Sequence, residues 1–351
     1  MMRLPWFRYV APRTVARAAA ALGDAAPGEA MLLAGGTDLL PNMKRRQQTP
    51  QVLIGLRGVA EMQKIRNGKG LRVGGAVTLT SLVADRRVRA GYGALWQAAA
   101  QVATPHLRNA ATLGGNICLD TRCNYYDQNY EWRKAIDFCM KKDGETCWVA
   151  PSSKRCLAVS STDTAPALIA LGARVRLVSR AEGERTVAVR DLYQNDGIHY
   201  LLRRPDEVLA EVLLDPVAGW RSAYWKLRRR GSFDFPVLGA AAALRLAPSV
   251  GAQRPVVEEA RIVLGAVASR PIVCDGAAAV LAGHELTDAA IAGAAEAAWE
   301  AAKPMDNTDF VYHWRKRVVR EYVAYVLRDL RGDDMRAVRE ETARKDLLAV
   351  L

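Results

Sequence analysis

The sequence lacks the motifs of the commonest nucleotide-binding and zinc-binding folds. No Gly-x-Gly-x-x-Gly segment occurs among its 351 residues, which argues against a dinucleotide-binding Rossmann fold. Gly68-Lys69 is followed by Gly70 instead of serine or threonine, so the chain has no phosphate-binding P-loop either. No Cys-x2-Cys pair is present, and this argues against a zinc ribbon.

Long apolar runs are also missing. No stretch approaches the ~20 apolar residues that a membrane-spanning helix needs, so we expect no membrane span. The first 23 residues carry four arginines and no uninterrupted apolar core, unlike a secretion signal. Pro12 is instead expected to open a helix whose inner face holds Val15, Ala18, Ala19 and Leu22. The sequence therefore predicts a cytoplasmic protein.

Acidic residues are few relative to basic ones. The 50 lysines and arginines outnumber the 37 acidic residues, which gives a net charge of +13 and an isoelectric point near 9.7. The basic residues are scattered and no nucleic-acid-binding motif accompanies them, so we expect no nucleic-acid partner. A basic surface for an acidic protein partner accounts for the charge at least as well. The four histidines are too dispersed to form a metal site.

The mixture of helical and strand-like patterns predicts an α+β fold. Half of the residues are hydrophobic, and a chain of this length can bury the cores of two or three domains. Pro216 and Gly219 interrupt the pattern, so we place a domain boundary near residues 215–219. Strands are expected at 31–34, 52–56, 71–77, 174–179, 186–190, 208–214, 224–228, 238–246 and 260–268, and helices at 14–22, 80–88, 94–103, 164–171, 288–302, 310–330 and 335–351.

Two Gly-Gly turns indicate a nucleotide-binding site. Gly35-Gly36 follows an apolar strand, and Gly114-Gly115 lies between Thr112 and Asn116. Glycines have no Cβ atom, so backbone N–H groups in such turns can approach and point at a pyrophosphate. A single Gly-Gly pair at a strand end is usually only a tight turn. Two such turns, each with a neighbouring threonine, make a dinucleotide site a plausible alternative to ordinary turns.

Four of the six cysteines fall within one short window: Cys123, Cys139, Cys147 and Cys156. Residues 124–155 are rich in Tyr, Trp, Lys and Asp, which predicts a loop without a core of its own. Such thiols pair as disulfides in a secreted protein, whereas in the reducing cytosol they bind zinc or an iron–sulfur cluster. Their wide intervals of 15, 7 and 8 residues lean away from a zinc ribbon. Cys118 and Cys274 are expected to be buried, inert thiols.

Further segments follow the glycine turns in a recognisable order. They read Ala34-Gly35-Gly36-Thr37-Asp38-Leu39, Ala111-Thr112-Leu113-Gly114-Gly115-Asn116, Asp163-Thr164-Ala165-Pro166-Ala167-Leu168 and Tyr224-Trp225-Lys226. This order resembles the FAD-binding medium subunit of the molybdenum hydroxylases, the family of xanthine, aldehyde and carbon monoxide dehydrogenases. The resemblance implies a two-subdomain FAD-binding domain of the PCMH type over residues 1–215, divided near residue 57. It also implies a C-terminal α+β domain like that of the carbon monoxide dehydrogenase flavoprotein over 216–330, and a helical tail over 331–351.

Ordinary members of that family lack the cysteine loop. The insertion, residues 121–158, resembles that of one branch, the β subunit of 4-hydroxybenzoyl-CoA reductase, in which the loop holds a [4Fe–4S] cluster. The resemblance therefore implies that Cys123, Cys139, Cys147 and Cys156 ligate such a cluster.

The resemblance also implies which residues bind FAD. Residues 32–39 would wrap the pyrophosphate, Thr112 and Asn116 would hold the phosphate and ribityl region, and Asp163 would hydrogen-bond the flavin. From the residues alone, we would expect Lys226 to be a surface lysine on a strand and Asp120 to cap a helix or turn. The full expected set is Leu32, Leu33, Ala34, Gly35, Gly36, Thr37, Asp38, Leu39, Thr112, Gly115, Asn116, Asp120, Asp163, Leu214 (packed on the adenine or the ring system) and Lys226 (near the isoalloxazine).

The function implied is electron transfer, with no catalytic residue acting on the organic substrate. The chain would work with a molybdopterin-binding large subunit and a [2Fe–2S] small subunit. In the reductase branch, electrons from a low-potential donor such as ferredoxin pass the [4Fe–4S] cluster and FAD towards molybdenum, where 4-hydroxybenzoyl-CoA is dehydroxylated. One alternative is the FAD subunit of a xanthine-, aldehyde- or carbon monoxide-type dehydrogenase that passes electrons to an acceptor. Another is a zinc-stapled scaffold subunit whose glycine turns are only turns.

Overall fold

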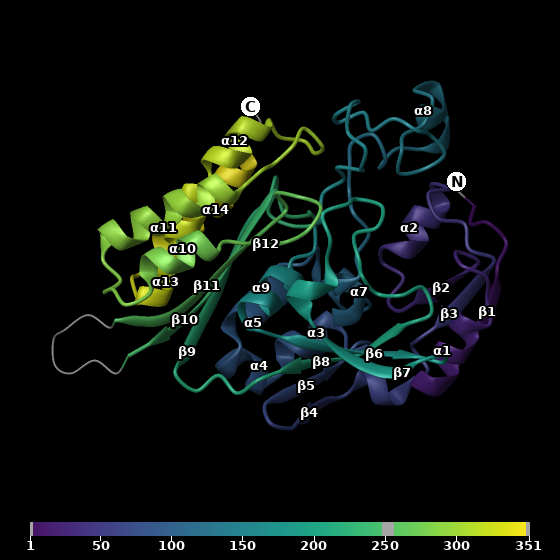
Figure 1. Cartoon of the computed structure of the whole chain (residues 1–351), viewed down its shortest axis with the longest axis horizontal. Helices are drawn as coiled ribbons and strands as arrows, with labels where there is room; N and C mark the ends of the chain where they lie inside the picture. The colour runs from purple at the N-terminus through teal and green to yellow at the C-terminus, as the bar shows by residue number, and fades with distance from the viewer. Residues whose placement is uncertain (1–2, 248–255, 349–351) are drawn as a thin grey trace.

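Three sheets, placed side by side along the molecule, organise the chain (Figure 1). The computed structural model describes residues 3–247 and 256–348, with side chains as far as residue 342. Within these ranges, no helix is both long and apolar enough to cross a membrane.

The first sheet is small and parallel, with strand order β1-β3-β2. Helix α1 covers it, and Thr14 starts that helix because its hydroxyl accepts a hydrogen bond from the Arg17 N–H at 3.2 Å. The elements are β1 (Arg8–Val10), α1 (Val15–Gly23), β2 (Ala30–Leu33), α2 (Leu39–Lys44) and β3 (Val52–Gly55). The buried side of α1 comprises Val15, Ala18, Ala19 and Leu22, as expected from the sequence.

The central sheet has five antiparallel strands in the order β4-β5-β8-β6-β7. These are β4 (Ile65–Asn67), β5 (Leu71–Gly74), β6 (Arg174–Ser179), β7 (Gly183–Ala188) and β8 (Val208–Leu214). The short helices around it are η1 (Ala60–Gln63), α3 (Leu79–Ala84), α4 (Arg86–Gly91), α5 (Gly93–Ala100), α6 (Pro105–Arg108), α7 (Leu113–Ile117), α9 (Thr164–Ala170) and η2 (Val189–Leu192).

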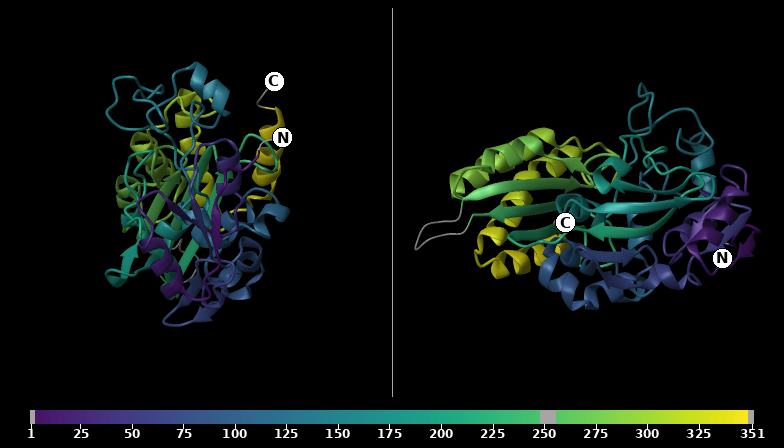
Figure 2. Two further views of the ribbon diagram at one scale, coloured as in Figure 1. Left: turned by 90° about the vertical axis from the view of Figure 1, so that its right-hand side faces the viewer. Right: turned by 60° about the horizontal axis from the view of Figure 1, so that its bottom comes forward.

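The third sheet is antiparallel, in the order β12-β11-β10-β9, and both of its faces are covered (Figure 2). Alternate residues of β10 enter different cores: Ala241 and Ala243 join the core of the central unit, whereas Ala240 and Ala242 join the C-terminal core. The elements are β9 (Trp220–Leu227), β10 (Leu238–Leu246), β11 (Val257–Gly265), β12 (Ile272–Val273), α10 (Asp275–Leu281), α11 (Asp288–Ala301), α12 (Tyr312–Arg317), α13 (Val319–Arg331) and α14 (Arg336–Leu348).

The cysteine loop, residues 121–158, stands away from the sheets and contains one short helix, α8 (Tyr130–Ala135) (Figure 1). Its two ends are held together by a backbone pair, in which Arg122 and Val159 exchange hydrogen bonds of 2.8 and 2.7 Å. Asn307 of the C-terminal part also binds both ends. Its carbonyl accepts from the Asn124 N–H at 3.0 Å, and its side-chain amide donates to the Leu157 carbonyl at 2.6 Å.

The structure differs from the expected elements in several places. The strand expected at 71–77 ends at Gly74, and the first helix starts at Thr14 and not at Pro12. The helix expected at 80–88 breaks at Asp85, whose carboxylate accepts from the Arg87 and Val88 N–H groups and so starts a second helix. The helix expected at 310–330 is divided at Val318 into α12 and α13. The strand expected at 186–190 ends earlier, in a 3₁₀ turn. Residues 349–351 of the expected helical tail lie outside the described residues.

The C-terminal core yields a stability prediction. Leu327 of α13 is fully buried, so Leu327→Ala should lower the free energy of unfolding by about 2–5 kcal/mol through lost burial and a residual cavity. Glu321→Ala, on an exposed position of the same helix, should cost less than about 1 kcal/mol. Denaturant unfolding of the two variants tests this, and equal effects would contradict the assignment of the buried face.

Candidate flavin site

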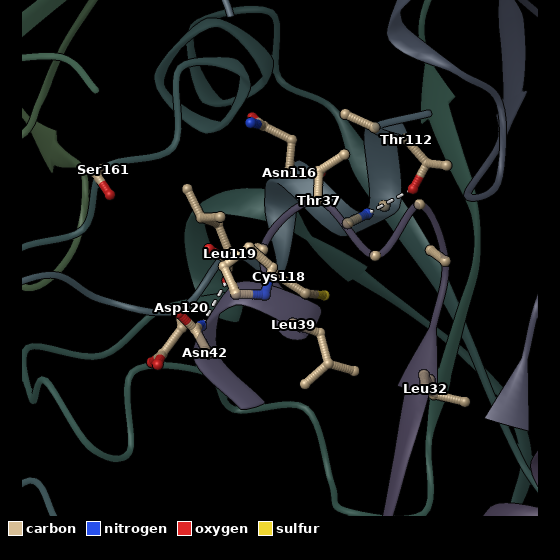
Figure 3. Close-up of a pocket in the computed structure, with 18 of the residues that line it drawn as sticks. Leu32, Thr37, Leu39, Asn42, Thr112, Asn116, Cys118, Leu119, Asp120 and Ser161 are labelled. Atoms are coloured by element: carbon tan, nitrogen blue, oxygen red, sulfur yellow. Dashed lines mark hydrogen bonds between the residues drawn. The ribbon is translucent and has the colours of Figure 1, made fainter. Parts of the chain in front are cut away.

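One cavity of about 440 Å³ lies where the first sheet, the central unit and the connection between β9 and β10 meet (Figure 3). Both glycine turns border it. Of the residues expected from the sequence, its wall includes Leu32, Ala34, Gly35, Gly36, Thr37, Asp38, Leu39, Thr112, Gly115, Asn116, Asp120 and Asp163. Segments far apart in the chain, from Leu22 to Phe235, are thus brought together around one space.

The first glycine turn has a shape that only glycine allows. Gly36 has a φ of +73°, in the left-handed region that other residues rarely adopt. A Cβ atom on Gly35 would lie 2.1 Å from the carbonyl oxygen of Ala110, so this turn packs directly on the backbone that leads into the second turn. Among the described residues, the N–H groups of Gly35, Gly36 and Thr37 have no hydrogen-bond acceptor. All three residues line the cavity, as a phosphate-binding turn requires.

The second glycine turn makes more hydrogen bonds within the protein than expected, so it offers fewer free groups to a ligand. The Gly115 N–H donates to the Thr112 hydroxyl at 3.1 Å, so it is not a free donor for a ligand. The Asn116 side-chain oxygen accepts from Thr162 and from both the backbone and the hydroxyl of Thr164, and it thereby fixes the start of α9. The Ser161 hydroxyl, in contrast, is buried, lines the cavity and has no partner among the described residues. Ser161 was not among the site residues expected from the sequence, although it lies two residues before Asp163.

A buried ion pair forms part of the cavity wall and extends behind it. Asp163, at the start of α9, accepts from Lys226 Nζ at 3.0 Å and from the Tyr224 hydroxyl at 2.8 Å. Burial raises the pKa of Asp163 and lowers the pKa of Lys226, while their mutual attraction opposes both shifts. Lys226 also donates to the carbonyls of Gln101 and Asp234, so its ammonium is fully satisfied. Lys226 is therefore not a surface lysine.

Three expected residues do not reach the cavity wall. Lys226 is not part of the lining and contacts it through the Asp163 carboxylate and the Asp234 carbonyl. Leu33 is in β2 but is not part of the lining. Leu214 lies in β8, pairs with Leu71 and is buried in the core of the central unit. Cys118, which was expected to be buried, is half-buried and lines the cavity.

The four cysteines of the loop are buried, and none forms a disulfide. Cys123, Cys139 and Cys156 pack in one small cluster with Tyr126, and Cys147 is close enough to Cys156 to act on its ionisation. Burial raises the pKa of the Cys123 thiol to about 12 and that of Cys156 to about 11. Within the described ranges, no group of three or more His, Cys, Asp and Glu side chains has the arrangement of a metal site.

The cysteine loop also buries positive charge. Arg133 of α8 is fully buried, and two of its guanidinium nitrogens have no partner in the part of the chain described. Lys141 is nearly as buried. Four buried thiols gathered in one loop are a donor set that fits a thiolate-bound metal centre in its chemistry.

Comparisons with known proteins agree with the fold and the cavity. Residues 5–215 match the family model for the FAD binding domain in molybdopterin dehydrogenase, and residues 222–330 match that for the CO dehydrogenase flavoprotein C-terminal domain. The chain is 33% identical over 275 residues to the aldehyde oxidoreductase FAD-binding subunit PaoB of Escherichia coli K12, covering 76% of this chain and 82% of that protein. It is 29% identical to the carbon monoxide dehydrogenase medium chain of Hydrogenophaga pseudoflava, covering 86% and 89%.

A solved structure of carbon monoxide dehydrogenase from Hydrogenophaga pseudoflava, lacking the Mo-pyranopterin moiety, contains a similar chain. It superimposes with a TM-score of 0.75 at 27% identity and covers 94% of this chain and 99% of that one. Fold and cavity together therefore define a flavin-binding subunit of an oxidoreductase. The chain belongs to the FAD-binding medium subunits of the molybdenum hydroxylase family, of the carbon monoxide, xanthine and aldehyde dehydrogenase type.

The first glycine turn gives a binding prediction with a matched control. Gly36→Ala forces a Cβ into a left-handed conformation at the cavity, which should cost about 1 kcal/mol of stability and weaken FAD binding by displacing the free N–H groups. Gly28 has a φ of +83° and open space around it, away from the cavity, so Gly28→Ala should cost similar stability and leave FAD binding unchanged. Flavin titration of both variants decides the matter. Equal loss of affinity in both would contradict the role of this turn.

The ion pair gives a stability prediction. Lys226→Met leaves the Asp163 carboxylate buried without its cation, which should lower the free energy of unfolding by about 3–5 kcal/mol. Combining it with Asp163→Asn removes both charges and should recover most of that loss. Denaturant unfolding of the single and double variants measures the coupling. Additive losses would show that the two side chains do not act as a pair.

Proposed function

We propose that this chain carries FAD as the electron-transfer subunit of a molybdenum-containing dehydrogenase acting on a xanthine-, aldehyde- or carbon monoxide-type substrate. It would pass electrons from a molybdopterin-binding large subunit and a [2Fe–2S] small subunit to an acceptor. The observation that carries the proposal is the meeting of two glycine turns around one cavity, with free N–H donors on the first turn. The similarity to PaoB and to carbon monoxide dehydrogenase medium chains supports the choice of substrate class.

Each part of the cavity has a distinct task in this proposal. Bound FAD supplies the capacity to accept electrons from one centre and deliver them to another. The N–H groups of Gly35, Gly36 and Thr37 bind the pyrophosphate, and the Ser161 hydroxyl and the Asn116 amide bind polar groups further along the cofactor. Asp163 accepts a hydrogen bond from the cofactor, while Lys226 keeps that carboxylate ionised and oriented. No residue of the chain acts on the organic substrate.

The cysteine loop adds a second centre to this proposal. Cys123, Cys139, Cys147 and Cys156 are proposed to ligate a [4Fe–4S] cluster, as the resemblance to the reductase branch implies. The burial of all four thiols, three of them packed in one cluster, supports it. In the described ranges the thiols do not have the arrangement of a metal site.

A second candidate function reverses the direction of the electrons. In a reductase of the 4-hydroxybenzoyl-CoA type, a low-potential donor such as ferredoxin delivers electrons to the loop cluster and then to FAD. The four-cysteine loop favours this candidate, and the net charge of +13 suits an acidic donor. The relatives favour the dehydrogenase instead, since they include aldehyde, nicotinate, xanthine and carbon monoxide enzymes. A zinc-stapled scaffold remains a third candidate, which absorbance in the visible range separates from both.

The cluster proposal is tested by replacing single cysteines. Serine is a harder ligand than cysteine, so Ser variants of Cys123, Cys139, Cys147 and Cys156 should each lose iron or change cluster type. Cys118 and Cys274 lie outside the loop, and Cys118→Ser and Cys274→Ser should keep the iron content of the unmodified chain. Iron and flavin are measured in all six variants prepared without oxygen.

Three possible results separate the cluster proposal from the flavin proposal. Iron loss confined to the four loop variants, with flavin retained, supports both centres. Zinc in place of iron in the unmodified chain would rule out the cluster but leave the flavin proposal standing. Absence of flavin after incubation with FAD would overturn the proposed function itself.

A further inference from the structure

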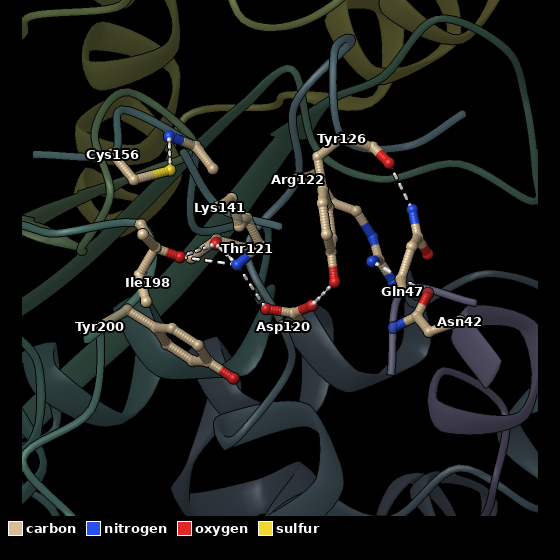
Figure 4. A network of polar contacts seen from close by, with 12 residues as sticks. Asn42, Gln47, Asp120, Thr121, Arg122, Tyr126, Lys141, Cys156, Ile198 and Tyr200 are labelled. Carbon is tan, nitrogen blue, oxygen red and sulfur yellow. Dashed lines mark hydrogen bonds and ion pairs between the residues drawn. The ribbon is translucent and has the colours of Figure 1, made fainter. Parts of the chain in front are cut away.

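Lys141 connects the cysteine loop to the wall of the cavity (Figure 4). It lies in the loop between Cys139 and Cys147, and its side chain is only 6% exposed. Its ammonium donates to Asp120 Oδ1 at 2.8 Å, to the Thr121 hydroxyl at 2.7 Å and to the Gly197 carbonyl at 2.7 Å. All three of its N–H donors are therefore used, which fixes the position of the charge.

Asp120 faces the cavity from the other side of this contact. It lines the cavity and is 5% exposed. Its second oxygen, Oδ2, accepts from the Tyr126 hydroxyl at 3.1 Å and from Gln48 Nε2 at 3.3 Å, so both oxygens are held. Lys141 is its cationic partner among the described residues, because the nearby guanidinium of Arg122 is paired with Asp38.

Two aromatic rings enclose the Lys141 ammonium. It lies 4.8 Å from the centre of the Tyr126 ring, which packs with three of the cysteines, and 5.6 Å from the Tyr200 ring, which lines the cavity. The charge thus sits in a water-poor space between the thiols and the cavity, where electrostatic interactions are stronger than at the surface. A contact that only anchored the cysteine loop to the rest of the chain would not need a buried charged group.

We propose that Lys141 sets the reduction potential of the flavin by neutralising Asp120, so that a residue of the cysteine loop tunes the cofactor of the main domain. The proposal rests on the binding of FAD in this cavity. Reduction adds electrons to the flavin, and an unpaired carboxylate on the cavity wall would oppose that gain of negative charge. With Lys141 in place the carboxylate is compensated, and the flavin is reduced more easily. Lys141 is a positioning residue, since it acts through Asp120.

Four variants of the full chain with bound FAD separate this role from simple anchoring. Lys141→Met should lower the midpoint potential of the flavin, and Asp120→Asn should raise it. The double variant should return it close to that of the unmodified chain. Lys141→Arg keeps the charge and should keep most of the potential. Lys134→Met removes an exposed lysine from the same loop and should leave the potential unchanged, because Lys134 has no carboxylate partner among the described residues.

The measurement is an equilibrium redox titration of the flavin band against a dye of known potential, with iron content determined in parallel. Opposite shifts in the two single variants and their cancellation in the double variant support the proposal. An unchanged potential in Lys141→Met overturns it, as does a double variant shifted as far as Lys141→Met. If Lys141→Met does not fold, Asp120→Asn decides alone, since an unchanged or lowered potential contradicts the proposal.

Repeating the titrations in a Cys156→Ser background distinguishes failure of this inference from failure of the cluster proposal. The pattern of shifts should persist there, because it depends on Asp120 and not on iron. A pattern that disappears with the iron would overturn the inference, while leaving the cluster assignment intact. An unmodified chain that binds no FAD would overturn both the proposed function and this inference, and this is seen before any variant is made.

Discussion

The buried ion pair between Asp163 and Lys226 is the contact on which the architecture of the cavity depends. Asp163 begins α9 in the central unit, and Lys226 lies on β9 of the C-terminal sheet, so their 3.0 Å contact joins the two parts at the cavity wall. Burial penalises both charges, which makes each dependent on the other. The apolar packing of Tyr224, Ala241 and Val263 against the central helices holds the sheet where the pair can form. Packing and charge therefore specify the same arrangement of the two units.

The cysteine loop is attached to this framework by polar contacts and not by a large apolar core. One backbone pair, Arg122 with Val159, closes its base, and Asn307 holds both of its ends from the C-terminal side. Asp120 and Lys141 then tie its interior to the cavity wall. Figure 4 shows Lys141 between Cys156 of the loop and Asp120, which lines the cavity. Such an arrangement suits two redox centres that exchange electrons, and it lets the loop influence the cavity electrostatically.

Much of this site was accessible from the sequence because backbone geometry limits the residue type. Gly36 must be glycine for its positive φ, and Gly35 must be glycine to pack on Ala110, so both leave a visible signature. Strands at 174–179, 208–214 and 238–246 were predicted with the bounds that the structure has. The last two are largely apolar runs, as in buried strands, and in the first arginines alternate with apolar residues.

Other features left no local signal. The burial of Lys226 and the link from Lys141 to Asp120 depend on tertiary contacts between distant segments. The break at Asp85 arises from a side-chain cap that competes with a continuous helical pattern. Leu214 was expected at the cofactor but is a core residue of β8, because an apolar residue at the end of a strand can face either side. Ser161 shows the same limit, because only the fold reveals that its hydroxyl is buried without a partner.

The most direct test of this account is the flavin and metal content of the unmodified chain, isolated without oxygen. The account predicts about one FAD and about four irons per chain, with flavin bands superimposed on the broad absorption of an iron–sulfur cluster. A chain that binds zinc and no flavin would contradict it, because the glycine turns would then be ordinary turns and the cysteine loop a structural staple.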